Sequence, residues 1–216
     1  MTYRRPIFGL VALCAASWVA GCSVLDPKPD YSRTYVLHAL TAKTAPAPPP
    51  DPTLMLAVFL PDLPDVLAGQ QMVTRLNANE VNLDEFHRWA EPLDNGFSRV
   101  LAQDISLFSD STHVAATPLP PGFGQHFEIY IKVLQFDGKT RGDVTLQAQW
   151  RMTGPEGKPN YLMHETTFVR HVASGTDPSA EYAEALSALI GDLARAIVEA
   201  APEARTASAT LPAATP

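Results

Sequence analysis

Two stretches of the chain repeat apolar residues with the spacing of one helix face. The first follows Pro92, with offsets of 0, 4, 7, 8, 12 and 15: Leu93, Phe97, Val100, Leu101, Ile105 and Phe108. The second follows Asp177 and Pro178 with similar spacing: Tyr182, Leu186, Leu189, Ile190, Leu193 and Ile197. Such stripes are typical of amphipathic helices. Proline suits the first helical position and aspartate the N-cap, so the helices are predicted to begin at these residues.

Alternation of apolar and polar residues indicates the strands. It is clearest in three runs, residues 127–134, 144–152 and 161–172. The connections between them, at 137–142 and 154–160, carry Gly and Pro and predict an antiparallel meander. Shorter β-prone runs lie at 34–40, 54–60, 72–76, 80–86 and 113–116, and residues 66–69 are predicted as a helical turn. Polar partners on the middle strand of the meander predict that one face of the sheet is solvated.

These elements predict an α/β (α+β) fold: a two-layer sandwich whose mixed, mostly antiparallel sheet carries both amphipathic helices on one face. We expect a single domain of residues 34–201, a length that can build one hydrophobic core. Residues 41–53 are rich in Ala and Pro and predict a surface loop with polyproline character, with a Pro-rich recognition motif as the alternative. Residues 202–216 are rich in Ala, Thr and Pro and predict a disordered tail.

The N-terminus has the pattern of an export signal. Arg4 and Arg5 precede an apolar run, residues 7–20, and the run ends in Val19-Ala20-Gly21-Cys22. The run is shorter than the roughly 20 residues of a transmembrane helix. Small residues before a cysteine are typical of a bacterial lipobox, so residues 1–21 are predicted as a signal peptide and Cys22 as the acylated first residue. A plain secretory signal followed by a chance cysteine is the alternative.

Residues 22–33 are predicted as the lipidated cysteine and a tether. Ten extended residues, 23–32, span at most about 33–36 Å, so the domain is expected to stay close to its membrane. In Gram-negative lipoproteins the residue after the acylated cysteine helps to choose the membrane, and aspartate there favours the inner one. Ser23 therefore predicts transfer to the outer membrane, with the domain facing the periplasm.

Charge and cysteine content narrow the function further. Without residues 1–21 the chain keeps 14 basic and 23 acidic residues, a net charge of −9. An acidic surface argues against a nucleic-acid partner and against adhesion to anionic lipid headgroups. The chain has two cysteines, Cys14 in the predicted signal and Cys22 at the acylation site, so no thiol remains for a disulfide or a metal. The histidines lack ligand spacing, and no cofactor or metal is expected.

One segment, residues 80–94, mixes aromatic and charged residues just before the first helix. Asp84, Glu85, His87 and Glu91 could be drawn as an acid/base group, but no nucleophile or oxyanion donor accompanies them, so an enzyme is not expected. In one interpretation Phe86 and Trp89 are core anchors, and polar neighbours fix the turn. In the other the segment is a partner-binding surface, since Trp and Arg are favoured at interfaces, with these contact residues: Glu85, His87, Arg88 and Glu91.

The same region carries a family resemblance. Residues 63–67, the run Gln71-Met-Val-Thr-Arg-Leu-Asn-Ala-Asn-Glu80 and the run Glu85-Phe-His-Arg-Trp-Ala-Glu-Pro-Leu93 resemble the PqiC family, the ABC-type transport auxiliary lipoproteins of MCE (mammalian cell entry) lipid-transport systems. The resemblance implies a non-enzymatic outer-membrane lipoprotein that docks or caps an MCE assembly. The implied partners are an MCE-domain protein of the PqiB type and outer-membrane lipids through acylated Cys22. Because MCE assemblies are symmetric rings, the resemblance also suggests a homo-oligomeric ring.

A periplasmic lipid-binding carrier is the alternative function. It requires an apolar pocket between the helices and the sheet, for which these residues are candidates: Phe97, Leu101, Ile105, Tyr182 and Leu186. The same residues would also fill an ordinary hydrophobic core, and that interpretation is favoured.

Cys22→Ser is expected to abolish lipidation, because no other cysteine follows the small residues of the lipobox. Metabolic labelling with a fatty acid measures this directly. Equal labelling of the variant and the unchanged protein would show that Cys22 is not the acyl acceptor.

Overall fold

Eight strands and two α-helices are present in the computed structural model, which describes residues 30–43, 46–154, 163–172 and 175–210. The predicted signal peptide, Cys22 and Ser23 lie outside these residues. The strands are β1 (Arg33–Tyr35), β2 (Leu56–Val58), β3 (Gln71–Asn77), β4 (Glu80–Trp89), β5 (Val114–Ala116), β6 (Phe127–Gly138), β7 (Asp143–Thr153) and β8 (Met163–His171). The helices are α2 (Leu93–Ser109) and α3 (Pro178–Thr210), with a 3-10 turn η2 at Asp65–Leu67.

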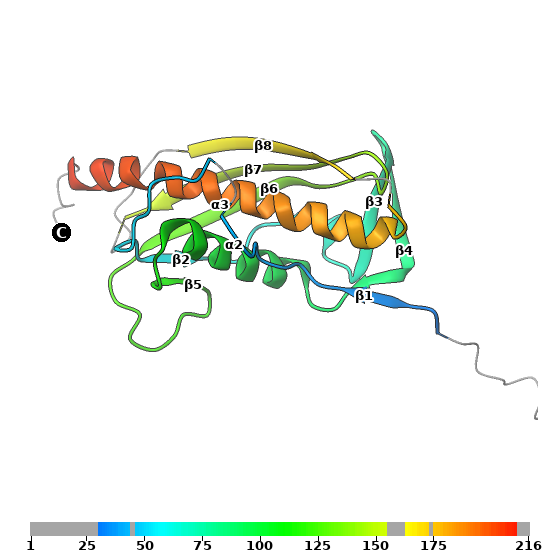
Figure 1. Cartoon of the computed structure of the whole chain (residues 1–216), viewed down its shortest axis with the longest axis horizontal. Coiled ribbons are helices and arrows are strands. Elements are labelled where there is room, and N and C mark those ends of the chain that lie inside the picture. Colours follow the sequence, from blue (N-terminus) through cyan, green and yellow to red (C-terminus); the bar gives the residue numbers. More distant parts are fainter. Residues whose placement is uncertain (1–29, 44–45, 155–162, 173–174, 211–216) are drawn as a thin grey trace, which may run out of the picture. The chain divides into compact units, whose positions relative to one another are not determined.

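The larger sheet has five strands in the order β5-β2-β6-β7-β8 (Figure 1). Strands β6, β7 and β8 pair antiparallel in sequence order, which confirms the predicted meander. Strand β2 pairs parallel with both β5 and β6, so it lies inside the sheet, as its continuous apolar run indicates.

A second sheet of three strands, in the order β1-β4-β3, stands at one end of the domain (Figure 1). The sequence predicted one sheet, because alternation shows that a segment is a strand but not which strand lies beside it. The expectation of mixed, mostly antiparallel pairing is confirmed by the lengths of the ladders. Among the described strands, three pairs are parallel and three antiparallel, although the antiparallel ladders are longer.

Both helices cover one face of the five-stranded sheet, which confirms the predicted α+β class (Figure 1). Helix α2 lies against β5 and β2, and α3 lies against β7 and β8, with the apolar stripes of both helices buried. The ring of Phe97 on α2 meets that of Phe136 on β6 edge to face, with centroids 5.3 Å apart. All five side chains proposed for a carrier pocket are at most 1% exposed and belong to this core: Phe97, Leu101, Ile105, Tyr182 and Leu186.

The helix starts differ in detail from the prediction. Asp177 caps α3 as expected, since its Oδ1 accepts the N–H of Ala180 at 3.1 Å. Pro92 is the residue before α2 rather than its first residue. It has no side-chain oxygen, so it makes no side-chain cap hydrogen bond.

Residues 36–43, here called the crossing segment, follow β1, which ends at Tyr35. Residues 36–40 were predicted as part of a strand, and residues 41–43 as part of the Pro-rich loop. Side chains of the helices bind the backbone of this segment instead. Asp104 Oδ1 accepts the N–H of Leu40 at 2.7 Å, and Ser187 Oγ accepts that of His38 at 3.2 Å. The carbonyl of Leu37 accepts from Arg99 at 3.0 Å. These three backbone groups are bound by side chains of the helices instead of by a neighbouring strand.

Helix α3 continues through Pro202 to Thr210, so the predicted disorder is wrong for residues 202–210; residues 211–216 lie outside the described part. A proline removes one helical hydrogen bond, which tertiary contacts can outweigh. Ala201 and Ala204 are buried, at 1% and 4% exposed. Arg205 forms an ion pair of 2.9 Å with Asp51 in the Pro-rich loop. These contacts hold the end of the helix against the domain.

Asp104 is a buried carboxyl in the middle of α2. Its side chain is 0% exposed and its Oδ2 has no hydrogen-bond partner in the described residues. Burial raises the pKa of Asp104 to about 6, against the opposing effects of the Leu40 N–H and the charge of His38. The folded protein therefore binds a proton here more tightly than the unfolded chain does.

The contribution of Asp104 to stability is expected to fall as pH rises from about 4 to about 6, because the raised folded pKa favours the protonated form. The loss is at most about 3 kcal/mol. Asp104→Asn keeps an oxygen for Leu40 but cannot titrate. Urea unfolding of both proteins at pH about 4.5 and about 7 gives their free energies of unfolding. The free energy of unfolding of the variant, minus that of the unchanged protein, should be larger at the higher pH. An equal difference at both pH values would contradict this.

Candidate functional site

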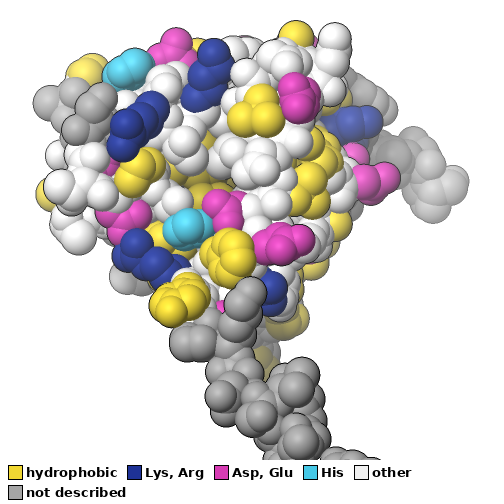
Figure 2. Space-filling view, turned by 90° about the vertical axis from the view of Figure 1, so that its right-hand side faces the viewer, with side chains coloured by type: hydrophobic (Ala, Val, Ile, Leu, Met, Phe, Trp, Pro, Cys, Tyr) yellow, Lys and Arg dark blue, Asp and Glu magenta, His cyan; other side chains and the backbone are white. Residues whose placement is uncertain are grey.

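The segment singled out by sequence, residues 80–94, forms β4 and the start of α2. It lies at the end of the domain that carries the three-stranded sheet. Figure 2 views this end and shows apolar, basic and acidic side chains intermixed on it. Strand β4 is the middle strand, with β1 on one side and β3 on the other.

A bulge interrupts β4 at residues 84–88. Met72 on β3 lies opposite Asp84, but its neighbour Gln71 lies opposite Arg88. One step along β3 therefore corresponds to four along β4, and three residues of β4 have no counterpart on β3: Glu85, Phe86 and His87. A bulge of this kind redirects side chains away from the regular alternation.

Asp84 stabilises the bulge with both carboxylate oxygens. Oδ1 accepts the backbone N–H of Phe86 at 2.9 Å and that of His87 at 3.1 Å. Oδ2 lies 2.9 Å from Nδ1 of the His87 ring. The carboxylate thus replaces the strand partners that these backbone groups lack.

The two aromatic residues of the segment have different environments. Trp89, just after the bulge, is buried at 5% exposed, and its N–H donates to the carbonyl of Gln70 at 2.7 Å. Phe86 is 56% exposed. The expectation that both are core anchors is confirmed for Trp89 and wrong for Phe86, because the bulge turns the intervening residues outward.

His87 and Glu91 are bound within the domain. The ring of His87 is held by Asp84, and its centroid lies 5.8 Å from that of Tyr35 on β1. Glu91 forms an ion pair with Arg99 of α2, and Arg99 in turn binds the crossing segment. These contacts give both residues a structural role at the junction of strand and helix.

Glu85, Phe86 and Arg88 are exposed, and we call them the bulge surface. Arg88 Nε donates to the carbonyl of Glu85 at 2.9 Å, which holds the guanidinium beside the bulge. Of the four candidate contact residues from the sequence, the structure therefore leaves Glu85 and Arg88 accessible. Sequence reasoning missed Phe86 as a third, since an aromatic residue in a strand is more often buried.

A polar pocket of about 460 Å³ lies beside the bulge, between the three-stranded sheet and the start of α3. Asp84, His87, Arg33 and Asp177 line it, together with Met72 and several hydroxyl side chains. Its charged groups are already paired: Arg33 lies 2.6 Å from Asp177, and His87 is bound to Asp84. The backbone N–H of Ala180, at the start of α3, and the guanidinium of Arg33 lower the pKa of Asp177, so its carboxylate is charged at neutral pH.

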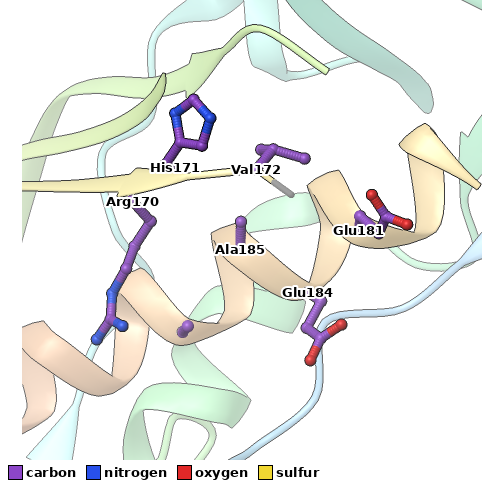
Figure 3. A pocket seen from close by; sticks show the side chains of 7 residues that line it. Arg170, His171, Val172, Glu181, Glu184 and Ala185 are labelled. Atoms are coloured by element: carbon purple, nitrogen blue, oxygen red, sulfur yellow. The ribbon is translucent and has the colours of Figure 1, made fainter. Parts of the chain in front are cut away.

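A second pocket, of about 270 Å³, lies between the end of β8 and α3 (Figure 3). Arg170 points toward α3 and pairs with Asp192 at 2.6 Å, while His171 points away from it (Figure 3). Glu181 and Glu184 project from the first turns of the helix. The Arg170 hydrogen bond to Asp192 raises the pKa of the guanidinium, which keeps this ion pair charged. Glu181 and Glu184 point in different directions, and Glu181 accepts the N–H of Gly175 at 2.9 Å (Figure 3).

The part of the chain that the structure describes has no group of three or more His, Cys, Asp or Glu side chains placed to hold a metal ion. No helix there is both long and apolar enough to cross a bilayer.

Comparison with known proteins gives the family. A family model described as the ABC-type transport auxiliary lipoprotein component matches residues 35–198, from β1 to the later part of α3. The chain belongs to this family. The resemblance seen in the sequence is thereby confirmed.

Two curated relatives are named intermembrane transport lipoprotein PqiC, one from Escherichia coli (strain K12) and one from Shigella flexneri. Each is 29% identical over 136 residues, which cover 63% of this chain and 69% of the relative. These matches and the family model together show an auxiliary lipoprotein component of a transport system. A lipoprotein of such a system is associated with a membrane.

Solved structures share the fold. Protein XCC0632 from Xanthomonas campestris superposes with a TM-score of 0.65 at 14% identity, over 81% of this chain and 99% of that one. A crystal structure of an uncharacterized protein gives 0.57 at 20% identity, over 77% and 96%. At these identities the likeness shows the fold alone.

Trp89→Ala and Phe86→Ala are expected to differ strongly in stability. Truncating the buried tryptophan should cost about 3–5 kcal/mol. Truncating the exposed phenylalanine should change the free energy of unfolding by no more than about 0.5 kcal/mol. Urea unfolding measures both. A large loss for Phe86→Ala would show that its ring packs inside the domain.

Proposed function

We propose that this protein is a non-enzymatic outer-membrane lipoprotein subunit of an MCE-type intermembrane lipid transport system, which docks or caps the MCE assembly at the outer membrane. The observation that carries the proposal is the family match over residues 35–198 in a chain with a lipobox cysteine a few residues ahead of it. The name of the PqiC relatives, intermembrane transport lipoprotein, supports a role between two membranes.

The proposed location follows from the N-terminus. Acylated Cys22 would anchor the domain, and Ser23 favours the outer membrane over the inner one. Several acyl chains hold a protein on a bilayer almost irreversibly, since each buried CH₂ contributes about 0.8 kcal/mol. The domain would then face the periplasm, where an assembly spanning from the inner membrane can reach it.

The proposed partner is an MCE-domain protein of the PqiB type, and the proposed contact is the bulge surface. An exposed aromatic ring beside an arginine has the composition of an interface anchor. Asp84 fixes the backbone there, so a partner would meet these side chains in a preformed arrangement with little ordering cost. His87 and Glu91 would support the surface from behind.

The carrier alternative lacks support from the fold. The side chains that could have lined an apolar cavity pack against one another and against the sheet in the core. A lipid tail would have to displace them.

Arg88→Ala is expected to weaken co-purification with a PqiB-type MCE protein without changing the melting temperature, because Arg88 is exposed and its one side-chain hydrogen bond is local. Lys132→Ala is a matched control, since Lys132 is an exposed cation on another surface, the outer face of β6. Pull-down of the tagged protein from detergent-solubilised membranes gives the partner yield. Full recovery with Arg88→Ala would remove the bulge surface from the proposed interface.

A further inference from the structure

Two turns lie side by side at the end of the domain that bears the three-stranded sheet. One joins β3 to β4, and the other joins β6 to β7 (Figure 1). Arg75 of β3 links them by donating to both oxygens of Asp137 on β6, at 2.8 and 2.7 Å. Leu76 and Thr140, one from each turn region, line the same pocket.

These turns present apolar side chains to solvent. Leu76, at the register shift just before the β3–β4 turn, is 54% exposed, and Leu83, opposite Val73 on the same hairpin, is 48% exposed. Exposed aliphatic surface is unfavourable by about 25 cal/mol per Å², and contact with an apolar phase would remove this cost.

The same turns carry cations. Lys139 and Arg141 are exposed and form no ion pair within the described residues. Of the nearby acids, Asp137 is paired with Arg75 and Asp143 lies 2.8 Å from His171. Glu80 accepts a hydrogen bond from the neutral side-chain amide of Asn77 at 2.7 Å. We call Leu76, Leu83, Lys139 and Arg141 the tip surface.

The N-terminal strand enters the domain at this same end. Arg33 of β1 pairs with Asp177 at the start of α3, and both residues line the pocket that Leu76 and Thr140 share. From Cys22 to Arg33 the chain has eleven residues, which reach at most about 36–40 Å. Helix α3 runs away from this end for 33 residues, or about 50 Å. A domain standing on its opposite end would therefore hold Arg33 beyond the reach of an anchor at Cys22.

We propose that the tip surface rests on the lipid leaflet that holds the acyl anchor. Leu76 and Leu83 enter the boundary between headgroups and acyl chains, while Lys139 and Arg141 lie among the lipid phosphates. Apolar side chains beside unpaired cations are the combination that binds this interface. The proposal rests on the proposed acylation of Cys22, and it leaves the bulge surface, farther along β4, for the protein partner.

The test uses the acylated protein in vesicles of phosphatidylethanolamine and phosphatidylglycerol. The acylated chain has no free thiol, so Leu76→Cys can carry a single environment-sensitive fluorophore. Met163→Cys and Val169→Cys are matched controls, because these side chains on β8 are 63% and 55% exposed. We expect blue-shifted emission and quenching by shallow spin-labelled lipids at position 76, and solvent-like emission at both controls.

Charge gives a second measurement. Lys139→Ala or Arg141→Ala should lower the ratio of docked to undocked label about fivefold each, and omission of phosphatidylglycerol should act in the same direction. Solvent-like emission at position 76 would overturn the proposal. Protection of position 76 only after a PqiB-type protein is added would also overturn it and would indicate a protein contact. A failure of acylation is distinguishable, because the protein would then incorporate no labelled fatty acid.

Discussion

The structure depends on a buried junction centred on the hydroxyl of Tyr182. This group donates to the carbonyl of Val73 at 2.7 Å and accepts the N–H of Gly138 at 3.2 Å. It thereby joins α3, β3 and β6, the elements at which the two sheets meet. Burial raises the pKa of Tyr182, so the ring stays neutral and can act as a donor. The Arg75–Asp137 pair reinforces the junction, and the position of the three-stranded sheet follows from both.

That small sheet carries the bulge surface and the two leucines of the tip surface. The five-stranded sheet and its helices form a generic core, similar to those of solved structures with little sequence identity. The β1-β4-β3 sheet departs from regular geometry, because Asp84 holds three residues of β4 out of register with β3. An exposed phenylalanine and arginine result from this bulge. A rigid core that carries one irregular strand segment is a common way to present binding residues.

The proposed anchor and the proposed surfaces belong to one end of the described domain. Strand β1 begins eleven residues after Cys22 of the predicted lipobox and lies against the bulged strand, with Arg33 opposite His87. The Arg33–Asp177 pair ties this strand to the start of α3. A short chain between anchor and β1 would thus constrain how the domain meets the membrane. The acidic charge of the remaining chain is consistent with a body that stays off anionic lipid and approaches it only through its few free cations.

The sequence by itself determined most of the secondary-structure elements and the fold class. Both amphipathic stripes, the meander, the predicted lipobox and the family resemblance follow from local patterns of neighbouring residues. Tertiary structure decided the rest. The crossing segment is not a strand because Asp104, Ser187 and Arg99 bind its backbone. The residues beyond Pro202 stay helical because Arg205 forms an ion pair with Asp51, which is distant in the sequence. Phe86 is exposed because a bulge shifts the alternation that burial would follow. Each outcome depends on partners distant in sequence, whose positions no local pattern contains.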